Sequence, residues 1–286
     1  MPNLVYRSLT PDDFPQMYRS FIETFSQYSV NMKMTKSAFE RRIQEKLNIN
    51  YDLSPAVFDG DKLVGFIFHA IADYQGIKTA YNGGTGVLPE YWGQEITQNL
   101  FAFCNPLLKN EGVKRCVLEV ITTNTPAIKA YEKAGFERTK TYRCFKLTSE
   151  MSSSITIEGL TLSTTDKPNL SSYKSIASTE PSMLDSFEQL IHNLSNELVI
   201  EAHQKDQLVG YLIYQPQLGR ISQMAVHSDH RNKGIGTCLI QAAYDQATVK
   251  ALSIINVASE QTDVLQFLNQ HGFENQIDQL EMELVF

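Results

Sequence analysis

The stretch Val226-His-Ser-Asp-His-Arg231-Asn-Lys-Gly234-Ile-Gly236-Thr237 lies between a predicted strand and a predicted helix. The strand is Arg220-Ile-Ser-Gln-Met-Ala-Val226. The helix begins near Gly234 and carries on one face the apolar residues Ile235, Leu239, Ile240 and Ala243. Backbone N–H groups at the start of a helix have no partner within the helix, so this position suits an anion.

Glycine and basic residues strengthen this interpretation. Gly234 and Gly236 leave the backbone open to a ligand because they carry no Cβ, and Arg231, Lys233 and the helix dipole offset negative charge. We therefore predict a pyrophosphate-binding loop. Its spacing differs from the GxGxxG pattern of dinucleotide-binding folds.

The chain repeats itself around this loop. Asp61-Lys-Leu-Val-Gly-Phe-Ile-Phe68 returns as Asp206-Gln-Leu-Val-Gly-Tyr-Leu-Ile213, and Tyr131-Glu-Lys-Ala-Gly-Phe136 is echoed by Leu268-Asn-Gln-His-Gly-Phe273. The polar stretch Thr148-Ser-Glu-Met-Ser-Ser-Ser154 is typical of a linker. We predict an N-terminal domain at 1–147, a linker at 148–154 and a C-terminal domain at 155–286.

Each half has the same order of predicted elements. The turns at Asp59-Gly60-Asp61 and Gln204-Lys205-Asp206 predict hairpins, and a third strand and a helix follow each. In the second half we expect another strand at 251–258 and a last helix that ends at Gly272. A helical region at 11–48 opens the first half, whereas the second half has a shorter segment around 181–193.

The spacing Arg-x-x-Gly-x-Gly after a strand resembles the coenzyme A pyrophosphate loop of the GNAT superfamily of N-acetyltransferases. The resemblance implies an α/β (α+β) chain of two tandem GNAT folds, each a mixed, mostly antiparallel central sheet flanked by helices. It implies acetyl-coenzyme A as cosubstrate and no metal. The backbone of a splayed strand would hold the acyl carbonyl and the pantetheine arm, here at Met224, Ala225 and Val226. The implied pyrophosphate-loop residues are Arg231, Asn232, Lys233, Gly234, Ile235, Gly236 and Thr237.

The first half contains Leu118-Glu119-Val-Ile-Thr-Thr-Asn124-Thr-Pro-Ala-Ile-Lys-Ala-Tyr131-Glu-Lys-Ala-Gly135-Phe136, which resembles the strand-five and helix-four signature of the same family. The resemblance implies that Tyr131 is the acid that protonates the leaving thiolate, and that Asn124 orders the turn or touches the cofactor. The spacing of Glu119 resembles the ribosomal-protein N-terminal acetyltransferase branch, in which that glutamate is the base. Glu119 could instead make a structural hydrogen bond, and Tyr131 could fill the core.

Each half departs from the family where the other matches it. In Val87-Leu-Pro-Glu-Tyr-Trp92-Gly-Gln-Glu95-Ile-Thr97, Trp92, Glu95 and Thr97 stand at the places of Arg231, Gly234 and Gly236. A repelling carboxylate and a lost cation would weaken pyrophosphate binding there by on the order of 1 to 3 kcal/mol.

The second half lacks the acid and base instead. Leu268, Gln261 and Asn256 stand at the places of Tyr131, Asn124 and Glu119. The nearest titratable side chains are His227 and Glu260. A bound thioester is already reactive, so transfer can proceed through positioning and water.

These patterns predict an enzyme, an N-acetyltransferase that transfers acetyl from acetyl-coenzyme A to a primary amine of a small molecule or peptide, with the donor held mainly by the C-terminal domain. One alternative places catalysis in the N-terminal domain through Glu119 and Tyr131, with a regulatory C-terminal domain. Another is a non-enzymatic acyl-coenzyme A sensor.

Composition sets further limits. The net charge of −7 argues against nucleic-acid partners, because phosphate backbones are bound by clustered Lys and Arg. No apolar run or signal-peptide pattern is present, and the four cysteines form no CxxC, so we expect a cytoplasmic protein with no membrane partner, as a monomer or homodimer. We expect the aromatic residues of the first helical region to be core: Phe21, Phe25, Tyr28 and Phe39.

Overall fold

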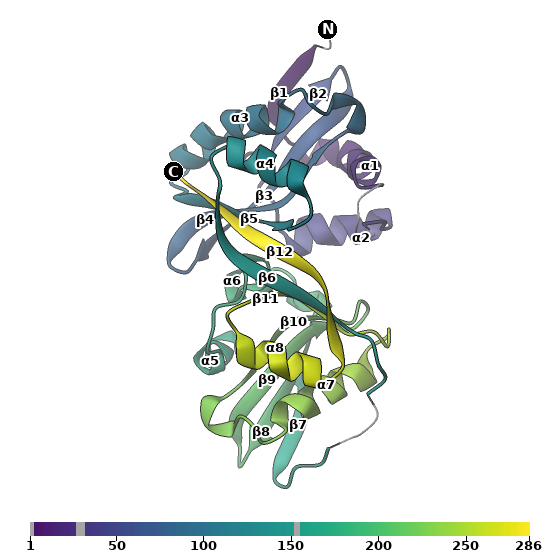
Figure 1. Ribbon diagram of the computed structural model, residues 1–286, viewed down its shortest axis with the longest axis vertical. Helices are drawn as coiled ribbons and strands as arrows, with labels where there is room; N and C mark the ends of the chain where they lie inside the picture. Colours follow the sequence, from purple (N-terminus) through teal and green to yellow (C-terminus); the bar gives the residue numbers. More distant parts are fainter. Residues whose placement is uncertain (1–2, 27–31, 152–154) are drawn as a thin grey trace. The chain divides into compact units, whose positions relative to one another are not determined.

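The computed structural model describes residues 3–26, 32–151 and 155–286. The chain forms two compact units (Figure 1). Unit 1 comprises Met1–Thr139 and Leu280–Phe286, and unit 2 comprises Lys140–Gln279. Each has a mixed, largely antiparallel sheet flanked by helices, which confirms the predicted fold class.

Unit 1 has six neighbouring strands in the order β1-β2-β3-β4-β5-β12. Its helices are α1, α2, α3 and α4, and short helical turns lie at Pro11–Asp13, Arg42–Lys46 and Pro89–Tyr91. The bounds of the larger elements are β1 (Leu4–Ser8), α1 (Phe14–Thr24), α2 (Lys36–Arg41), β2 (Pro55–Asp59), β3 (Lys62–Tyr74), β4 (Ile77–Val87), α3 (Ile96–Asn110), β5 (Arg115–Ile121), α4 (Thr125–Lys133) and β12 (Phe273–Val285).

Two layers of apolar side chains hold unit 1 together. On one face, α3 and α4 pack through Leu100, Phe101 and Tyr131 onto Leu118 of β5. Aromatic rings join α1 and α2 to β3, since Phe39 contacts both Phe21 (centroids 5.0 Å apart) and Phe68 (6.2 Å). Phe21 and Phe39 are fully buried, so their predicted core role is confirmed. The ring of Phe25 lies tilted against that of Phe21 and is half-buried, and Tyr28 lies outside the described residues.

Unit 2 has the strand order β6-β11-β10-β9-β8-β7. Short helical turns lie at Met183–Asp185, Leu194–Asn196 and Ser228–His230. The bounds of the larger elements are β6 (Glu137–Leu147), β7 (Leu160–Thr165), α5 (Leu170–Ile176), α6 (Phe187–Leu190), β8 (Leu198–Gln204), β9 (Gln207–Gln215), β10 (Arg220–Val226), α7 (Ile235–Gln246), β11 (Ser253–Ala258) and α8 (Thr262–Gln270).

The core of unit 2 also has two sides. Leu239 and Ile240 of α7 and Leu268 of α8 pack on Ile221 and Val257. A second cluster joins Tyr173 of α5 and Phe187 of α6 to Tyr211 and Ile213 of β9. Because side chains alternate along a strand, β10 directs Gln223 and Ala225 toward the α5–α6 side and Met224 and Val226 toward the α7–α8 side.

In both units one parallel strand pair opens toward one end. The pairing of β4 with β5 ends at Tyr81↔Val117, although β4 continues to Val87. The pairing of β10 with β11 ends at Ile221↔Ile254, although β10 continues to Val226. The backbone of the far part of β4 and of β10 is therefore not committed to its parallel neighbour.

The local elements follow the sequence pattern closely. β2 and β3 form a hairpin around Gly60, β8 and β9 form one around Lys205-Asp206, β10 has the predicted bounds, and α8 ends before Gly272, which has φ 78°. Helix α5 was not predicted; it is a serine-rich helix that Asn169 caps by accepting a hydrogen bond from Ser172 N–H (3.3 Å).

The units are not two consecutive stretches of chain. From Lys140 onward β6 belongs to unit 2, where Lys146 pairs with Ser253 of β11. The last residues of the chain belong to unit 1, where Phe286 N–H donates to Lys114 O (2.9 Å) beside β5. The predicted linker at 148–154 stays a prediction, and residues 152–154 lie outside the described part.

Among the described helices, none combines the length and the apolar character that crossing a bilayer requires.

The end of β12, which belongs to unit 1, should stabilise that unit. Met282 is fully buried in the same core cluster as Leu118. We expect Met282→Ala to lower the free energy of unfolding by about 2–5 kcal/mol because a cavity remains in the core. Urea denaturation followed by circular dichroism measures this. The control is Val285→Ala on the same strand, which is 71% exposed and should change stability by about 0.5 kcal/mol or less. Equal, small effects of both variants would contradict the role of β12 in this core.

Candidate functional site

The predicted loop of unit 2 forms a helix start with a left-handed residue. Gly234 is the N-cap of α7 with φ 82° and ψ 0°, a conformation that glycine adopts without steric cost. Cys238 N–H donates to Gly234 O (3.0 Å) as the helix begins. The N–H groups of Ile235, Gly236 and Thr237 come before that bond, so α7 itself gives them no acceptor. The backbone is therefore arranged to donate hydrogen bonds to an anion.

The basic side chains of this loop also brace its backbone. Arg231 donates from Nε to Val226 O (3.1 Å) and from Nη2 to Ser178 Oγ (2.7 Å). Lys233 is exposed and donates from Nζ to Asp229 O (2.8 Å). Arg231 thus shapes the loop and contributes a half-buried charge, and Lys233 adds an exposed charge beside it.

Both loop glycines are closely surrounded. A Cβ on Gly236 would lie 3.0 Å from Cζ of Phe267, and one on Gly234 would lie 3.4 Å from Cδ1 of Ile157. Thr237 Oγ1 is hydrogen-bonded to Nε2 of His271 (2.7 Å). Gly236 is therefore required by close packing, and Gly234 is required chiefly by its backbone conformation.

The three strand residues predicted to hold the acyl carbonyl and pantetheine lie on the free part of β10. Met224, Ala225 and Val226 pair with β9 on one edge, and they lie beyond the last pair with β11 on the other. An extended ligand could therefore add to that edge through backbone hydrogen bonds. Their role as ligands stays a prediction.

The loop of unit 1 has the same backbone path. A short helical turn, Pro89–Tyr91, matches Ser228–His230, and positive φ values occur at Gly93 (78°) and Glu95 (55°), as they do at Asn232 (59°) and Gly234 (82°). Trp92 donates from Nε1 to Val87 O (2.8 Å), the counterpart of the bond from Arg231 to Val226 O. Trp92 thus makes the same hydrogen bond to the loop backbone as Arg231 does, but it carries no positive charge.

The charge around the loop of unit 1 is reversed. Glu95 is the exposed N-cap of α3, where the matching residue of unit 2 is a glycine. Glu90 pairs with Lys62 (2.7 Å), and Tyr91 donates to Asp59 Oδ2 (2.8 Å). The carboxylates oppose a pyrophosphate, although the backbone would suit one.

Glu119 lies on β5 and is half-buried. Its Oε2 accepts a hydrogen bond from the Tyr81 hydroxyl on β4 (2.5 Å). Its neighbours Leu118 and Val120 belong to the core under α3 and α4, so Glu119 faces the opposite side of the sheet. The carboxylate therefore lies at the level where β4 and β5 separate.

Tyr131 and Asn124 have clear structural roles in unit 1. Tyr131 is 8% exposed in the core, with its ring 6.2 Å from Phe101 and 5.8 Å from Phe136. Asn124 is the N-cap of α4 and accepts a hydrogen bond from Ala127 N–H (3.3 Å). Tyr131 and Glu119 start from opposite sides of β5, so a reaction using both would need the acyl arm to pass between β4 and β5. Their catalytic and cofactor roles stay predictions.

The matching positions of unit 2 are also structural. Leu268 is buried in the core, and Asn256 is a buried residue in β11 with φ 57°, where the pairing with β6 shifts register. His227 accepts from Asp229 N–H at Nδ1 (3.3 Å), which helps to order the loop. Glu260 is exposed beyond β11.

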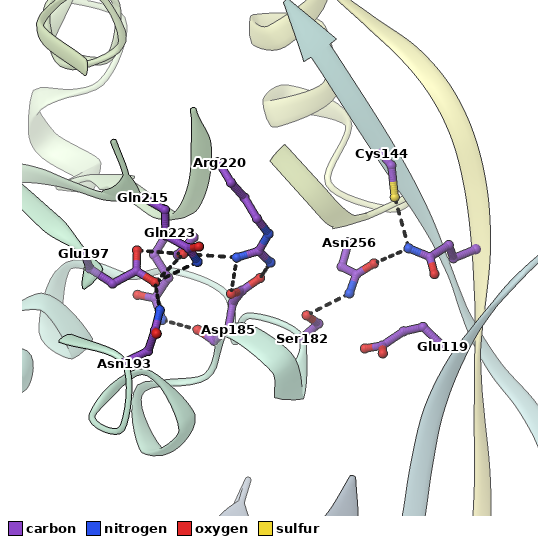
Figure 2. Close-up of polar contacts among 12 residues, drawn as sticks. Glu119, Cys144, Ser182, Asp185, Asn193, Glu197, Gln215, Arg220, Gln223 and Asn256 are labelled. Atoms are coloured by element: carbon purple, nitrogen blue, oxygen red, sulfur yellow. Dashed lines mark hydrogen bonds and ion pairs between the residues drawn. The ribbon is translucent and has the colours of Figure 1, made fainter. Parts of the chain in front are cut away.

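A cluster of polar groups that the sequence did not predict lies on the α5–α6 side of unit 2 (Figure 2). Arg220 binds both carboxylate oxygens of Asp185 (3.0 and 2.5 Å). Gln223 donates to Asp185 O (2.5 Å) and accepts from the Tyr211 hydroxyl (3.0 Å). Burial raises the pKa of Tyr211 above its ordinary value. Residue spacing could not signal this cluster because Asp185 and Arg220 come from different elements.

A second carboxylate was also missed in unit 1. Glu281 of β12 is 4% exposed and accepts a hydrogen bond from Thr139 Oγ1 (2.9 Å). Its neighbours Leu280 and Met282 pack with the core under α3 and α4, so Glu281 faces the same side as Glu119. Glu281 lies in unit 1 because the last residues of the chain, from Leu280 onward, belong to this unit.

Within the described residues, no three or more His, Cys, Asp or Glu side chains are grouped so as to hold a metal ion.

Comparison with known proteins agrees with this geometry. The model of the acetyltransferase (GNAT) family matches residues 14–136, and that of the acetyltransferase (GNAT) domain matches residues 195–275. The chain belongs to the GNAT acetyltransferase family as a tandem member. Family members transfer acyl groups from acyl-coenzyme A. A search of curated proteins found no significant match.

Solved structures share the fold over the whole chain. A GCN5-related N-acetyltransferase from Sphaerobacter thermophilus superposes with a TM-score of 0.76 at 15% identity, covering 100% of this chain and 96% of that one. A tandem GNAT protein from the clavulanic acid biosynthesis pathway gives 0.75 at 15% identity, covering 99% and 98%. A GCN5-related N-acetyltransferase from Kribbella flavida gives 0.64 at 14%, covering 99% and 71%.

The left-handed conformation of Glu95 should cost stability. We expect Glu95→Gly to be more stable than Glu95→Ala by about 1 kcal/mol, because only glycine adopts this conformation without a clash at Cβ. Thermal and urea unfolding of both variants measure the difference. The neighbouring pair Gln94→Gly and Gln94→Ala is the control, since Gln94 does not have positive φ and glycine should give no gain there. A Glu95→Gly variant no more stable than Glu95→Ala would contradict the strain.

Proposed function

We propose that the protein is an N-acetyltransferase that transfers the acetyl group of acetyl-coenzyme A to a primary amine of a small molecule or peptide. Unit 2 holds the donor. The observation that carries this proposal is the start of α7, where Gly234, Arg231 and Lys233 combine free backbone N–H groups with positive charge. The free edge of β10 leads directly into this loop.

The proposed binding mode uses the loop and the strand together. The pyrophosphate accepts hydrogen bonds from the N–H groups of residues 235–237, and the pantetheine arm lies along Met224, Ala225 and Val226. The neutral amine nitrogen then attacks the thioester carbonyl carbon, the C–S bond breaks to release the coenzyme A thiolate, and water carries the proton from the nitrogen to that thiolate. Neither a glutamate nor a tyrosine stands at the family's base and acid positions in unit 2. In this proposal, most of the rate enhancement therefore comes from holding the amine and the thioester close together in the right orientation.

Unit 1 binds the donor more weakly in this proposal. Its loop has the matching backbone path but presents Glu95 to the pyrophosphate and lacks both cations. One strong donor site per chain follows. A cytoplasmic location is part of the proposal and is supported by the cysteines, which are all buried free thiols.

The charge of Lys233 gives a direct test of donor binding. We expect Lys233→Gln to weaken acetyl-coenzyme A binding by about 3- to 10-fold, because one exposed cation near the pyrophosphate is lost. Isothermal titration calorimetry on the full chain measures affinity and stoichiometry. The control is Lys167→Gln, because Lys167 is also an exposed lysine. It follows Thr165, the last residue of β7, which pairs with Val199 near the start of β8, away from the loop. Unchanged binding in Lys233→Gln would contradict the unit 2 site.

A second candidate function places the transfer in unit 1, with unit 2 as a regulatory donor-binding unit. It is favoured by Glu119, a half-buried carboxylate at the opening of β4 and β5 that could accept a proton from an ammonium group. Glutamine at this position would still accept the hydrogen bond from Tyr81.

The two candidates differ in one variant. With transfer in unit 2, Glu119→Gln keeps its rate of thiol release on a panel of amines. A fall of about 100-fold or more, with donor binding unchanged, would move catalysis to unit 1. Glu137→Gln, an exposed glutamate of β6 in unit 1, is the control. Donor binding without turnover on any amine would favour an acyl-coenzyme A sensor.

A further inference from the structure

A short segment of unit 2 crosses the base of the opening between β10 and β11. We call Ser182–Asp185 the strap (Figure 2). Its Ser182 end accepts a hydrogen bond at Oγ from Asn256 Nδ2 of β11 (3.2 Å). Its Asp185 end binds Arg220 and Gln223 of β10. The strap therefore ties together two strands whose own pairing ends at Ile221↔Ile254.

Among the residues bonded to the strap, Asn256 is the one on β11, where the two strands begin to separate. It lies two residues beyond the last β10–β11 pair, and its left-handed backbone belongs to the irregular part of β11. Its side-chain amide is held at both ends, because Oδ1 accepts from Gln279 Nε2 (2.9 Å) while Nδ2 donates to Ser182. Gln279 Nε2 also contacts Cys144 Sγ (3.2 Å). The amide is therefore fixed and does not swing freely.

The groups around the base of the opening are buried and hydrogen-bonded to one another. Ser182, Asp185, Gln223 and Asn256 are 3–8% exposed, and their side chains hydrogen-bond to the strap or to its neighbours. Displacing one of them would leave a buried polar partner without its bond, which is costly. The network thus forms a rigid polar wall.

The proposed donor path leads to this wall. An arm that starts at the loop after Val226 and follows Ala225 and Met224 runs toward Gln223 and the paired end of the strands. In this binding mode the acyl tail, at the end of that arm, would lie next to Asn256 and the strap, which begin two residues beyond the last β10–β11 pair.

We propose that Asn256 and the strap limit the donor to a short acyl group, with acetyl accepted and longer unbranched chains excluded. This inference rests on the proposed donor site in unit 2. It names the acyl class of the donor and assigns its selection to a residue that stands at the place of the family's glutamate. Asn256 acts here as a specificity-determining side chain and transfers no proton.

Asn256→Gly tests the wall without a backbone penalty, because glycine suits a φ of 57°. The measurement is calorimetric binding of free coenzyme A, acetyl-coenzyme A and hexanoyl-coenzyme A to the full chain. We expect the native chain to bind hexanoyl-coenzyme A about tenfold or more weaker than acetyl-coenzyme A. The variant should lose most of this preference by gaining affinity for the hexanoyl donor, with acetyl-coenzyme A nearly unchanged.

Lys205→Gly is the matched control, since Lys205 also has positive φ (47°) but lies in the exposed hairpin between β8 and β9. It should keep the native preference. Equal binding of both donors by the native chain, or an unchanged preference in a folded Asn256→Gly variant, would overturn the inference. Failure of free coenzyme A to bind would instead overturn the proposed donor site, so the two failures are distinguishable.

Discussion

The arrangement of both units depends on a parallel strand pair that is hydrogen-bonded at one end only. In unit 2, β10 and β11 pair at Arg220↔Ser253 and Ile221↔Ile254, and β10 then continues along β9 alone. Backbone groups on a free strand edge need partners, and water or an extended ligand can supply them. The loop after β10 places the start of α7 beside that edge. One constraint thus brings together a strand edge and a helix start, two places where backbone groups have no partner within their own element.

The comparison of the two loops separates backbone shape from charge. Glu95 and Gly234 have the same left-handed conformation, and Trp92 and Arg231 donate to equivalent carbonyl oxygens. A glutamate does not prefer this conformation, so the flanking strand and helix impose it. The shape of the loop is therefore a property of the fold, whereas its affinity for an anion depends on side chains that differ between the copies.

Local sequence signals predicted the elements and the loop, because hairpin turns, helix starts and the stop at Gly272 depend on a few neighbouring residues. They could not predict features set by distant contacts. Glu281 lies beside β5 because the end of the last strand belongs to unit 1. The bond between Asp185 and Arg220 joins two segments that are far apart in the sequence. Glu119 lies on one face of the sheet, and the helix that carries Tyr131 packs on the other face. This follows from the alternation of side chains along β5, and the spacing of the motif does not encode it.

Charge decides how the two copies divide their work in the proposed function. Both have an opened strand pair and a helix start with the same backbone path, so geometry alone would give each a donor site. Unit 2 adds Arg231 and Lys233, whereas unit 1 adds Glu95 at the same helix end. Near a helix N-terminus a cation strengthens anion binding and a carboxylate competes with it. A pyrophosphate therefore favours unit 2, and unit 1 is free to keep Glu119 for another purpose without losing the fold.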